Sequence, residues 1–210
     1  MTHDTGFAPN PFFEALTLAT CKPTIRRTKK EGDWVAGFVA KELVNTSKND
    51  GVAVPYQGLV YLMRISEAMS LDAYFKDERF KNKKPIKDHP DPIKRSGDNI
   101  YHLIGDRYCQ HPNNSHDDSA EAINHDVRGV NVLIADMKES YYFGKNCLIP
   151  SSGWEGIGFN FSKGRTFYRT DSDLENIRVF LLKNGYAPGI HGKPCVFGKQ
   201  GNSSAHCGGC

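Results

Sequence analysis

The chain has 210 residues, of which 39% are hydrophobic and 24% charged, and its formal net charge is +3 at pH 7. This length allows one sizeable core, and no apolar run approaches the roughly 20 residues that a membrane-spanning helix needs. The six cysteines are too sparse for a disulfide scaffold, and the N-terminus does not resemble a secretory signal. We therefore expect a globular cytoplasmic protein with reduced thiols and no membrane partner.

The first predicted elements are strands. Residues 16–21 alternate apolar with small polar side chains, and Pro23 ends this strand because proline cannot donate a ladder hydrogen bond. A short β-prone run follows over 34–40, and residues 59–69 form the most hydrophobic, β-branched run of the chain, which predicts a central strand paired with the second one. Between these two strands, the Asn, Ser, Asp, Gly and Pro content of 42–58 predicts a loop.

The middle of the chain combines one helix with a long irregular segment. Ser70 is a typical N-cap for a helix over 71–80. The segment 82–126 is rich in proline, histidine and asparagine, and only 99–104 is strand-like within it. The run 128–136 then predicts a buried strand.

The last predicted elements are short strands and a helix. "YYFG", from Tyr141, and "GIGFNF", over 156–161, are strand-like. Asp171 or Ser172 predicts the cap of a helix with Leu174, Ile177 and Leu181 on one face, and Gly185 occupies the left-handed stop position.

Five or six strands with peripheral helices, and no helix after every strand, indicate an α+β fold. We predict a partly open β-barrel with long loops. A single domain is expected over 1–188, and a tail rich in cysteine, histidine and glycine over 189–210.

Several motifs occur in an order that resembles a known family. They include "GFAPNPFFEALTLATCKPTIRR", "EGDWVAGF", "LVYLMRISEAMSLDAYFKDERFKNKKP", "SGDNIYH" and "VLIADMKESYYFG". Together they resemble the second type of nucleotide modification associated domain, found in phage and bacterial proteins linked to DNA-base modification systems. The start of the 34–40 strand and the later "ISEA" are also similar to the barrel of the PUA and EVE domains, which bind RNA or modified bases. These resemblances imply a PUA-like barrel and a nucleotide or nucleic acid as partner.

The basic strand end "LATCKPTIRR" is the first candidate ligand site. Lys22, Arg26 and Arg27 are suited to bind phosphate oxygens, and arginine offers a planar fork for them. Cys21 adjoins them as a ligand contact or as a small buried hydrophobe. The proline-locked turn "FAPNPF" would hold Asn10 rigidly on the wall of the same pocket. The alternative is a surface-exposed strand end beside a purely structural anchor.

The loops "SGDNIYH" and "CQHPNNSHDD" carry the groups most suited to chemistry. We expect Asn99, Tyr101 and Ser115 to contact the ligand. As a second hypothesis, Asp98, His111 and His116 serve general acid and base roles in a metal-independent enzyme acting on a nucleotide or DNA base. The first hypothesis remains a nucleotide- or modified-base-binding protein of a DNA-modification system.

The tail offers a third hypothesis, a zinc-stapled interaction protein. Cysteine and histidine at this spacing are typical zinc ligands, although glycine-rich termini are often disordered. No cofactor other than this structural zinc is expected. Its proposed ligands are His191, Cys195, Cys207 and Cys210.

Overall fold

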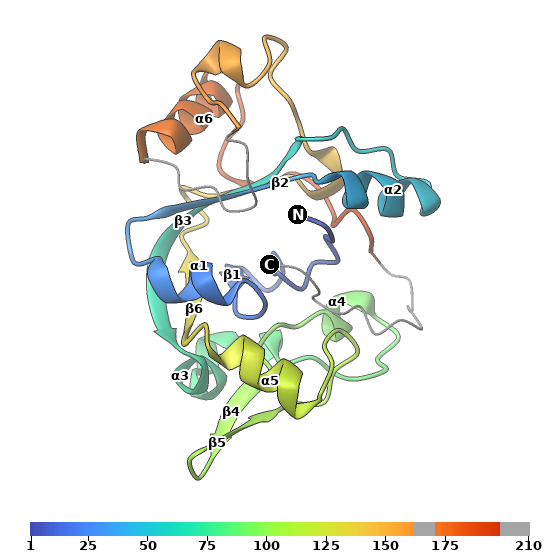
Figure 1. The fold of residues 1–210 in the computed structure, drawn as a ribbon, viewed down its shortest axis with the longest axis vertical. Helices are drawn as coiled ribbons and strands as arrows, with labels where there is room; N and C mark the ends of the chain where they lie inside the picture. The colour runs from blue at the N-terminus through green and yellow to red at the C-terminus, as the bar shows by residue number, and fades with distance from the viewer. Residues whose placement is uncertain (162–170, 198–210) are drawn as a thin grey trace.

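The computed structural model describes residues 1–161 and 171–197. Its main sheet has six strands in the order β1–β6–β3–β7–β8, with β2 paired to β3 beside this path. The sheet is an open, strongly curled half-barrel surrounded by helices and loops (Figure 1). The predicted α+β fold with a partly open barrel is confirmed, and its kinship with PUA-like barrels stays a prediction. Among the described residues, no helix has both the length and the apolar character needed to cross a bilayer.

The long central strand β3 (Leu59–Ser70) organises the sheet. Its first half pairs antiparallel with β2 (Trp34–Phe38) and with β7 (Tyr141–Tyr142). Its second half pairs with β6 (Asn131–Ala135) after a shift in register. Such an irregularity bends a strand, and β3 curves along one side of the molecule (Figure 1). The predicted central strand and its pairing with the second strand are confirmed.

Two short strands end the sheet on either side. β1 (Leu16–Leu18) pairs with β6, and the backbone of Asn10 exchanges two hydrogen bonds with Thr17 of β1 (2.8 and 3.0 Å). The opening turn therefore lies against the first strand. At the other end, β8 (Gly189–Ile190) pairs in parallel with β7. Residues 189–190, the start of the segment that we assigned to the tail, thus belong to the sheet.

Two predicted helices are confirmed, the first with its N-cap and the second with its C-terminal stop. The Ser70 hydroxyl accepts a hydrogen bond from Ala73 N (3.2 Å) at the start of α3 (Leu71–Lys76). At its end the chain becomes extended and continues as a separate 3-10 helix, η1 (Glu78–Lys83). Helix α6 (Asp171–Lys183) ends before Gly185, whose φ of 77° is left-handed as expected.

The apolar face of α6 covers one side of the sheet. The buried side chains of Leu174, Ile177 and Leu181 belong to the same cluster as Trp34 and Leu62. The periodicity of this helix thus correctly indicated the face that packs.

The loop predicted over 42–58 is wrong in its first half. Helix α2 (Lys41–Asn49) occupies it, because Leu43 is fully buried in the core and this packing outweighs the weak helix propensities of Asn45, Thr46 and Ser47. The irregular segment likewise contains an unpredicted helix, α5 (Ala120–Val127). Its N-cap is Ser119, whose hydroxyl accepts from Ala122 N (3.2 Å).

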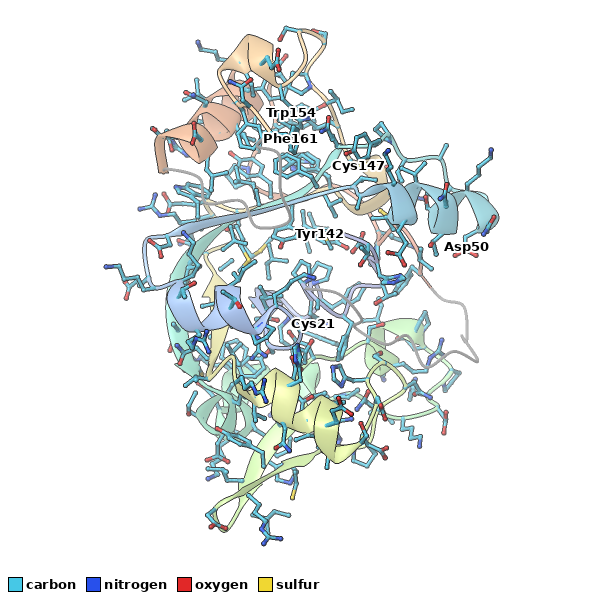
Figure 2. All side chains as sticks on the ribbon, viewed as in Figure 1. Cys21, Asp50, Tyr142, Cys147, Trp154 and Phe161 are labelled. Atoms are coloured by element: carbon cyan, nitrogen blue, oxygen red, sulfur yellow. The ribbon has the colours of Figure 1, made fainter. Side chains whose placement is uncertain are left out.

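The strand predicted over 156–161 is also wrong. A 3-10 turn, η3 (Glu155–Ile157), starts this segment, and Phe159 and Phe161 pack their rings 5.3 and 4.9 Å from that of Phe38. The nearby Trp154 ring completes the cluster (Figure 2). Aromatic packing rather than strand pairing therefore explains this apolar pattern.

The remaining elements are short and mostly peripheral. β4 (Tyr101–Ile104) and β5 (Arg107–Gln110) form a separate hairpin that projects from the body beside α3 (Figure 1). The other short helices are α1 (Pro23–Thr28), α4 (Pro92–Arg95) and η2 (Gly144–Asn146).

Candidate nucleic-acid interface

Asn10, expected on a pocket wall, is completely buried and hydrogen-bonded on both ends of its amide. Its Nδ2 donates to Gly6 O (2.9 Å) and Ser96 O (2.6 Å). Its Oδ1 accepts from Lys83 Nζ (2.8 Å) and from Phe12 N (3.1 Å). These bonds fix the turn to the loop before β4, so we assign Asn10 a structural role.

Asp98 lies in the same buried network. Its carboxylate accepts from Thr17 Oγ1 (2.7 Å) and from the Tyr74 hydroxyl (2.9 Å). Burial raises the pKa of Asp98, although the charge of Lys83 and these hydrogen bonds oppose the shift. Burial also lowers the pKa of Lys83 to about 8. The network holds β1, α3 and the irregular segment together.

Arg26, expected to bind phosphate, points inward from α1. Its guanidinium donates to Cys21 O (2.7 Å), to Asn131 O (3.1 Å), and to the carboxylate (3.0 Å) and backbone oxygen of Asp126. Gly129 leaves room for it, since a Cβ there would lie 2.4 Å from Arg26 Cζ. Because these protein acceptors surround the fully buried guanidinium, we do not place Arg26 at a phosphate.

His116 and Tyr101 extend this second network. His116 Nε2 lies 3.5 Å from Asp126 Oδ2, and its Nδ1 lies 3.1 Å from Asp117 O and 3.4 Å from the Tyr101 hydroxyl. Burial raises the pKa of Tyr101. The structure thus joins His116 to Asp126, whereas Asp98 belongs to the other network.

The other expected ligand contacts are divided between interior and surface. Asn99 is buried and donates to Tyr74 O (3.1 Å) and Phe80 O (3.2 Å). Ser115 is half-buried in a turn that Asn113 Oδ1 stabilises through Ser115 N (2.9 Å). Of the strand-end residues, Cys21 is buried, Lys22 half-buried and Arg27 exposed. Phosphate binding by Lys22 and Arg27 stays a prediction.

The expected zinc ligands are only partly described. His191 stacks on Phe143 with ring centroids 4.8 Å apart, and its Nε2 lies 2.8 Å from Ala187 O. Cys195 is buried, and its N–H donates to Asp4 Oδ2 (2.9 Å). Cys207 and Cys210 lie outside the described residues, so the zinc site stays a prediction.

Flat and cationic side chains meet at the surface between α3 and the β4–β5 hairpin. The ring of Phe75 stacks on His102, with centroids 4.4 Å apart and planes at 23°. Lys84 Nζ lies 4.0 Å from the centroid of Phe75, and the ring of His111 lies 5.9 Å away. All four side chains are partly exposed. We call Phe75, Lys84, His102 and His111 the stacking surface.

The electrostatics of the stacking surface favour anions. The pKa of His102 is lowered mainly by burial and further by His111 and two lysines, which outweighs the opposite effect of Asp72. Asp72 itself is hydrogen-bonded to Lys76 Nζ (2.6 Å) and to Leu103 N (2.9 Å), and these bonds lower its pKa. Near pH 7 the His102 imidazole is therefore a flat, neutral ring among cations.

Almost the whole chain matches one known protein family. A family model described as nucleotide modification associated domain 2 matches residues 1–200. The chain belongs to this family. No curated protein and no solved structure matches it. The resemblance drawn from the motifs is thus confirmed, and it connects the chain with nucleotide modification.

In this nucleotide modification associated domain, the stacking surface joins separate segments of the chain. Lys84 comes from a lysine-rich stretch that was not among the predicted site residues, and the loop motif "SGDNIYH" supplies His102. Phe75 lies in the helix predicted over 71–80 and was not among the predicted site residues. Its direct neighbour in sequence, the charged Lys76, was the available signal that this ring lies near the surface.

Proposed function

We propose that this nucleotide modification associated domain binds single-stranded nucleic acid at the stacking surface. The observation that carries the proposal is the stack of His102 on Phe75 with Lys84 over the ring, all partly exposed. Because His102 and Lys84 already cover the Phe75 ring, a base would stack on His102. Such stacking contributes about 1–3 kcal/mol per base with little sequence preference, while lysines neutralise the backbone phosphates. Family membership supports a nucleotide-related partner.

A single strand fits this surface better than a duplex. Stacking on a side chain requires an open base face, and in a duplex these faces are covered by neighbouring base pairs. In a phage or bacterial DNA-modification system, such a domain would hold an unpaired strand or a modified base.

We favour binding over turnover because the three expected acid and base groups contact different partners. Asp98 accepts from Thr17 and Tyr74, His116 lies beside Asp126, and His111 Nε2 lies 3.2 Å from Pro85 O. Asp98 and Asp126 are each about 1% exposed. The enzyme hypothesis stays a prediction that an assay for product would test.

The test is fluorescence anisotropy with a 3′-labelled oligo(dA) of about 12 nucleotides that carries no terminal phosphate. His102→Ala should weaken binding about tenfold by removing a stack. Lys84→Ala should reduce the slope of log affinity against log salt by about 0.7 for one lost phosphate contact.

Lys41→Ala is the matched control, because Lys41 Nζ also lies over an exposed aromatic ring, 5.9 Å from the centroid of Tyr56, but on α2. Its binding should equal that of the wild type. The proposal would be refuted if all three variants lost the same affinity, or if the wild type did not bind the single strand. Tighter binding to the matching duplex would refute it as well. Circular dichroism of every variant checks that it is folded.

A further inference from the structure

A pocket of about 250 Å³ lies between the end of α2, η2 and the segment after β8. Asp50 and Val52 follow α2 on one wall, and Lys145, Lys193 and Phe197 line the others. Figure 2 shows Asp50 at the tip of α2, far from α3 in the same view. The pocket is therefore separate from the stacking surface.

Two lysines from distant parts of the sequence are held side by side at this pocket. Lys145 N donates to Lys193 O (2.8 Å), which ties the two backbones together. This approach requires Gly144, where a Cβ would lie 2.1 Å from Lys193 O. Gly192 is needed equally, since its Cβ would lie 2.2 Å from Phe143 O. The backbone is thus built to bring two cations to one rim.

The two ammonium groups are available to a ligand. Both lysines are exposed, and within residues 1–161 and 171–197 neither forms an ion pair with a carboxylate. Two cations in the lining of one pocket make its potential positive, and this favours an anion. A phosphate group, with several acceptor oxygens, fits this requirement.

The rest of the pocket is suited to a flat ring. Phe197 is partly exposed and rests against Phe12, with ring centroids 5.3 Å apart, so its orientation is supported from behind. Val52 adds an apolar side chain and Cys195 the buried floor.

The floor of the pocket is uncharged near neutral pH. Burial and the nearby Asp4 carboxyl raise the pKa of the Cys195 thiol well above its usual range. Burial also raises the pKa of Asp4, which accepts from the Tyr142 hydroxyl (2.7 Å). A thiol held in this protonated state is a poor nucleophile, so the pocket is suited to binding and not to covalent attack.

We propose that this pocket binds a free nucleoside monophosphate, with the phosphate on Lys145 and Lys193 and the base against Phe197. The volume of about 250 Å³ lies just below the range of about 300–1,000 Å³ that is typical for drug-sized ligands, so the pocket has room for one nucleotide at most. The inference does not depend on the stacking surface.

The test is calorimetric titration of the full chain with AMP, CMP, GMP and UMP, and with adenosine and inorganic phosphate as fragments. At least one nucleotide should bind more tightly than either fragment, because only the nucleotide contacts the lysines and the ring together. The double variant that combines Lys145→Ala and Lys193→Ala should weaken nucleotide binding more than about tenfold. Phe197→Leu should weaken nucleotide binding while leaving phosphate binding unchanged.

Lys48→Ala is the control, since this exposed lysine lies on α2 close to Asp50 but does not line the pocket. It should bind like the wild type. A dinucleotide with a 5′ phosphate tests whether the pocket instead binds the phosphorylated end of a nucleic-acid strand. Binding of this dinucleotide alone, no nucleotide binding at millimolar concentration, or unchanged binding in the folded double variant would overturn the proposal.

Discussion

Lys83 carries its amino group into the protein interior, where backbone and amide oxygens accept its hydrogen bonds. Its Nζ donates to Asn10 O (3.2 Å), Asn10 Oδ1 (2.8 Å) and Ala15 O (2.8 Å). Burial without a directly bonded carboxylate lowers its pKa from 10.5 to about 8. This single side chain therefore makes stability depend on pH.

We expect the free energy of unfolding to rise with pH relative to a Lys83→Met variant. Between about pH 8 and 10.5 the unfolded chain binds the proton that the folded protein has released, so increasing pH favours folding. Over this window the free energy of unfolding of the wild type should rise by about 3 kcal/mol relative to that of the variant. Urea denaturation at a series of pH values measures it, with the partly exposed Lys84→Met as control. A difference that stays constant with pH would contradict the low pKa.

The buried pair of Arg26 and Asp126 supports a second prediction at the residue scale. Asp126→Ala should destabilise the protein by about 3–5 kcal/mol, because it leaves the fully buried guanidinium without its counter-ion. Arg79→Ala is the control, since it removes two exposed ion pairs, and should cost at most about 1 kcal/mol. Chemical denaturation measures the free energy of unfolding of both variants. A similar decrease in the two would contradict the prediction that the buried ion pair contributes more than the exposed ones.

At the scale of elements, the close approach of η2 to the segment after β8 positions the pocket. This approach places Gly144 against Lys193 O and ties the two backbones by a hydrogen bond. The geometry of the pocket therefore depends on a residue without a side chain.

Gly144→Ala should destabilise the protein more than Gly51→Ala does. Both glycines have positive φ, 53° and 75°, so both variants pay a backbone cost of about 1 kcal/mol. Only at Gly144 does the new Cβ also meet backbone, whereas at Gly51 nothing lies within 4 Å. Thermal denaturation compares them, and nucleotide titration should show binding lost only in Gly144→Ala. Equal stability and equal nucleotide binding in the two variants would contradict the prediction, because η2 would then shift to make room for the new Cβ.

At the scale of the whole molecule, the half-barrel separates the two proposed sites. The stacking surface belongs to α3 and the hairpin, while residues at the end of α2 and in η2 line the pocket. Figure 1 shows α2 far from α3 and the hairpin. The elements between them belong to one packed sheet.

We therefore expect the two ligands to bind independently. A saturating nucleoside monophosphate should change the affinity for the unphosphorylated oligonucleotide less than about twofold, because no charge or base is shared between the sites. Anisotropy titrations with and without nucleotide measure this. Competition between the ligands would place both in one site.

Local sequence signals were sufficient for the elements that depend on neighbouring residues. The apolar run of β3, the hydroxyl cap at Ser70 and the left-handed stop at Gly185 act over a few residues and were predicted correctly. Helix α2 was missed because the buried Leu43, and not its local propensities, holds it in place.

The roles of the polar residues depended on tertiary structure. The sequence presents Asn10, Arg26 and Asp98 as accessible polar groups, yet their partners lie far away along the chain, as Asp126 does from Arg26, separated by 100 positions. Lys145 and Lys193 meet only because two glycines let distant backbones touch. Residue types and local periods are written in the sequence, whereas burial and the meeting of distant charges arise only when the chain is packed.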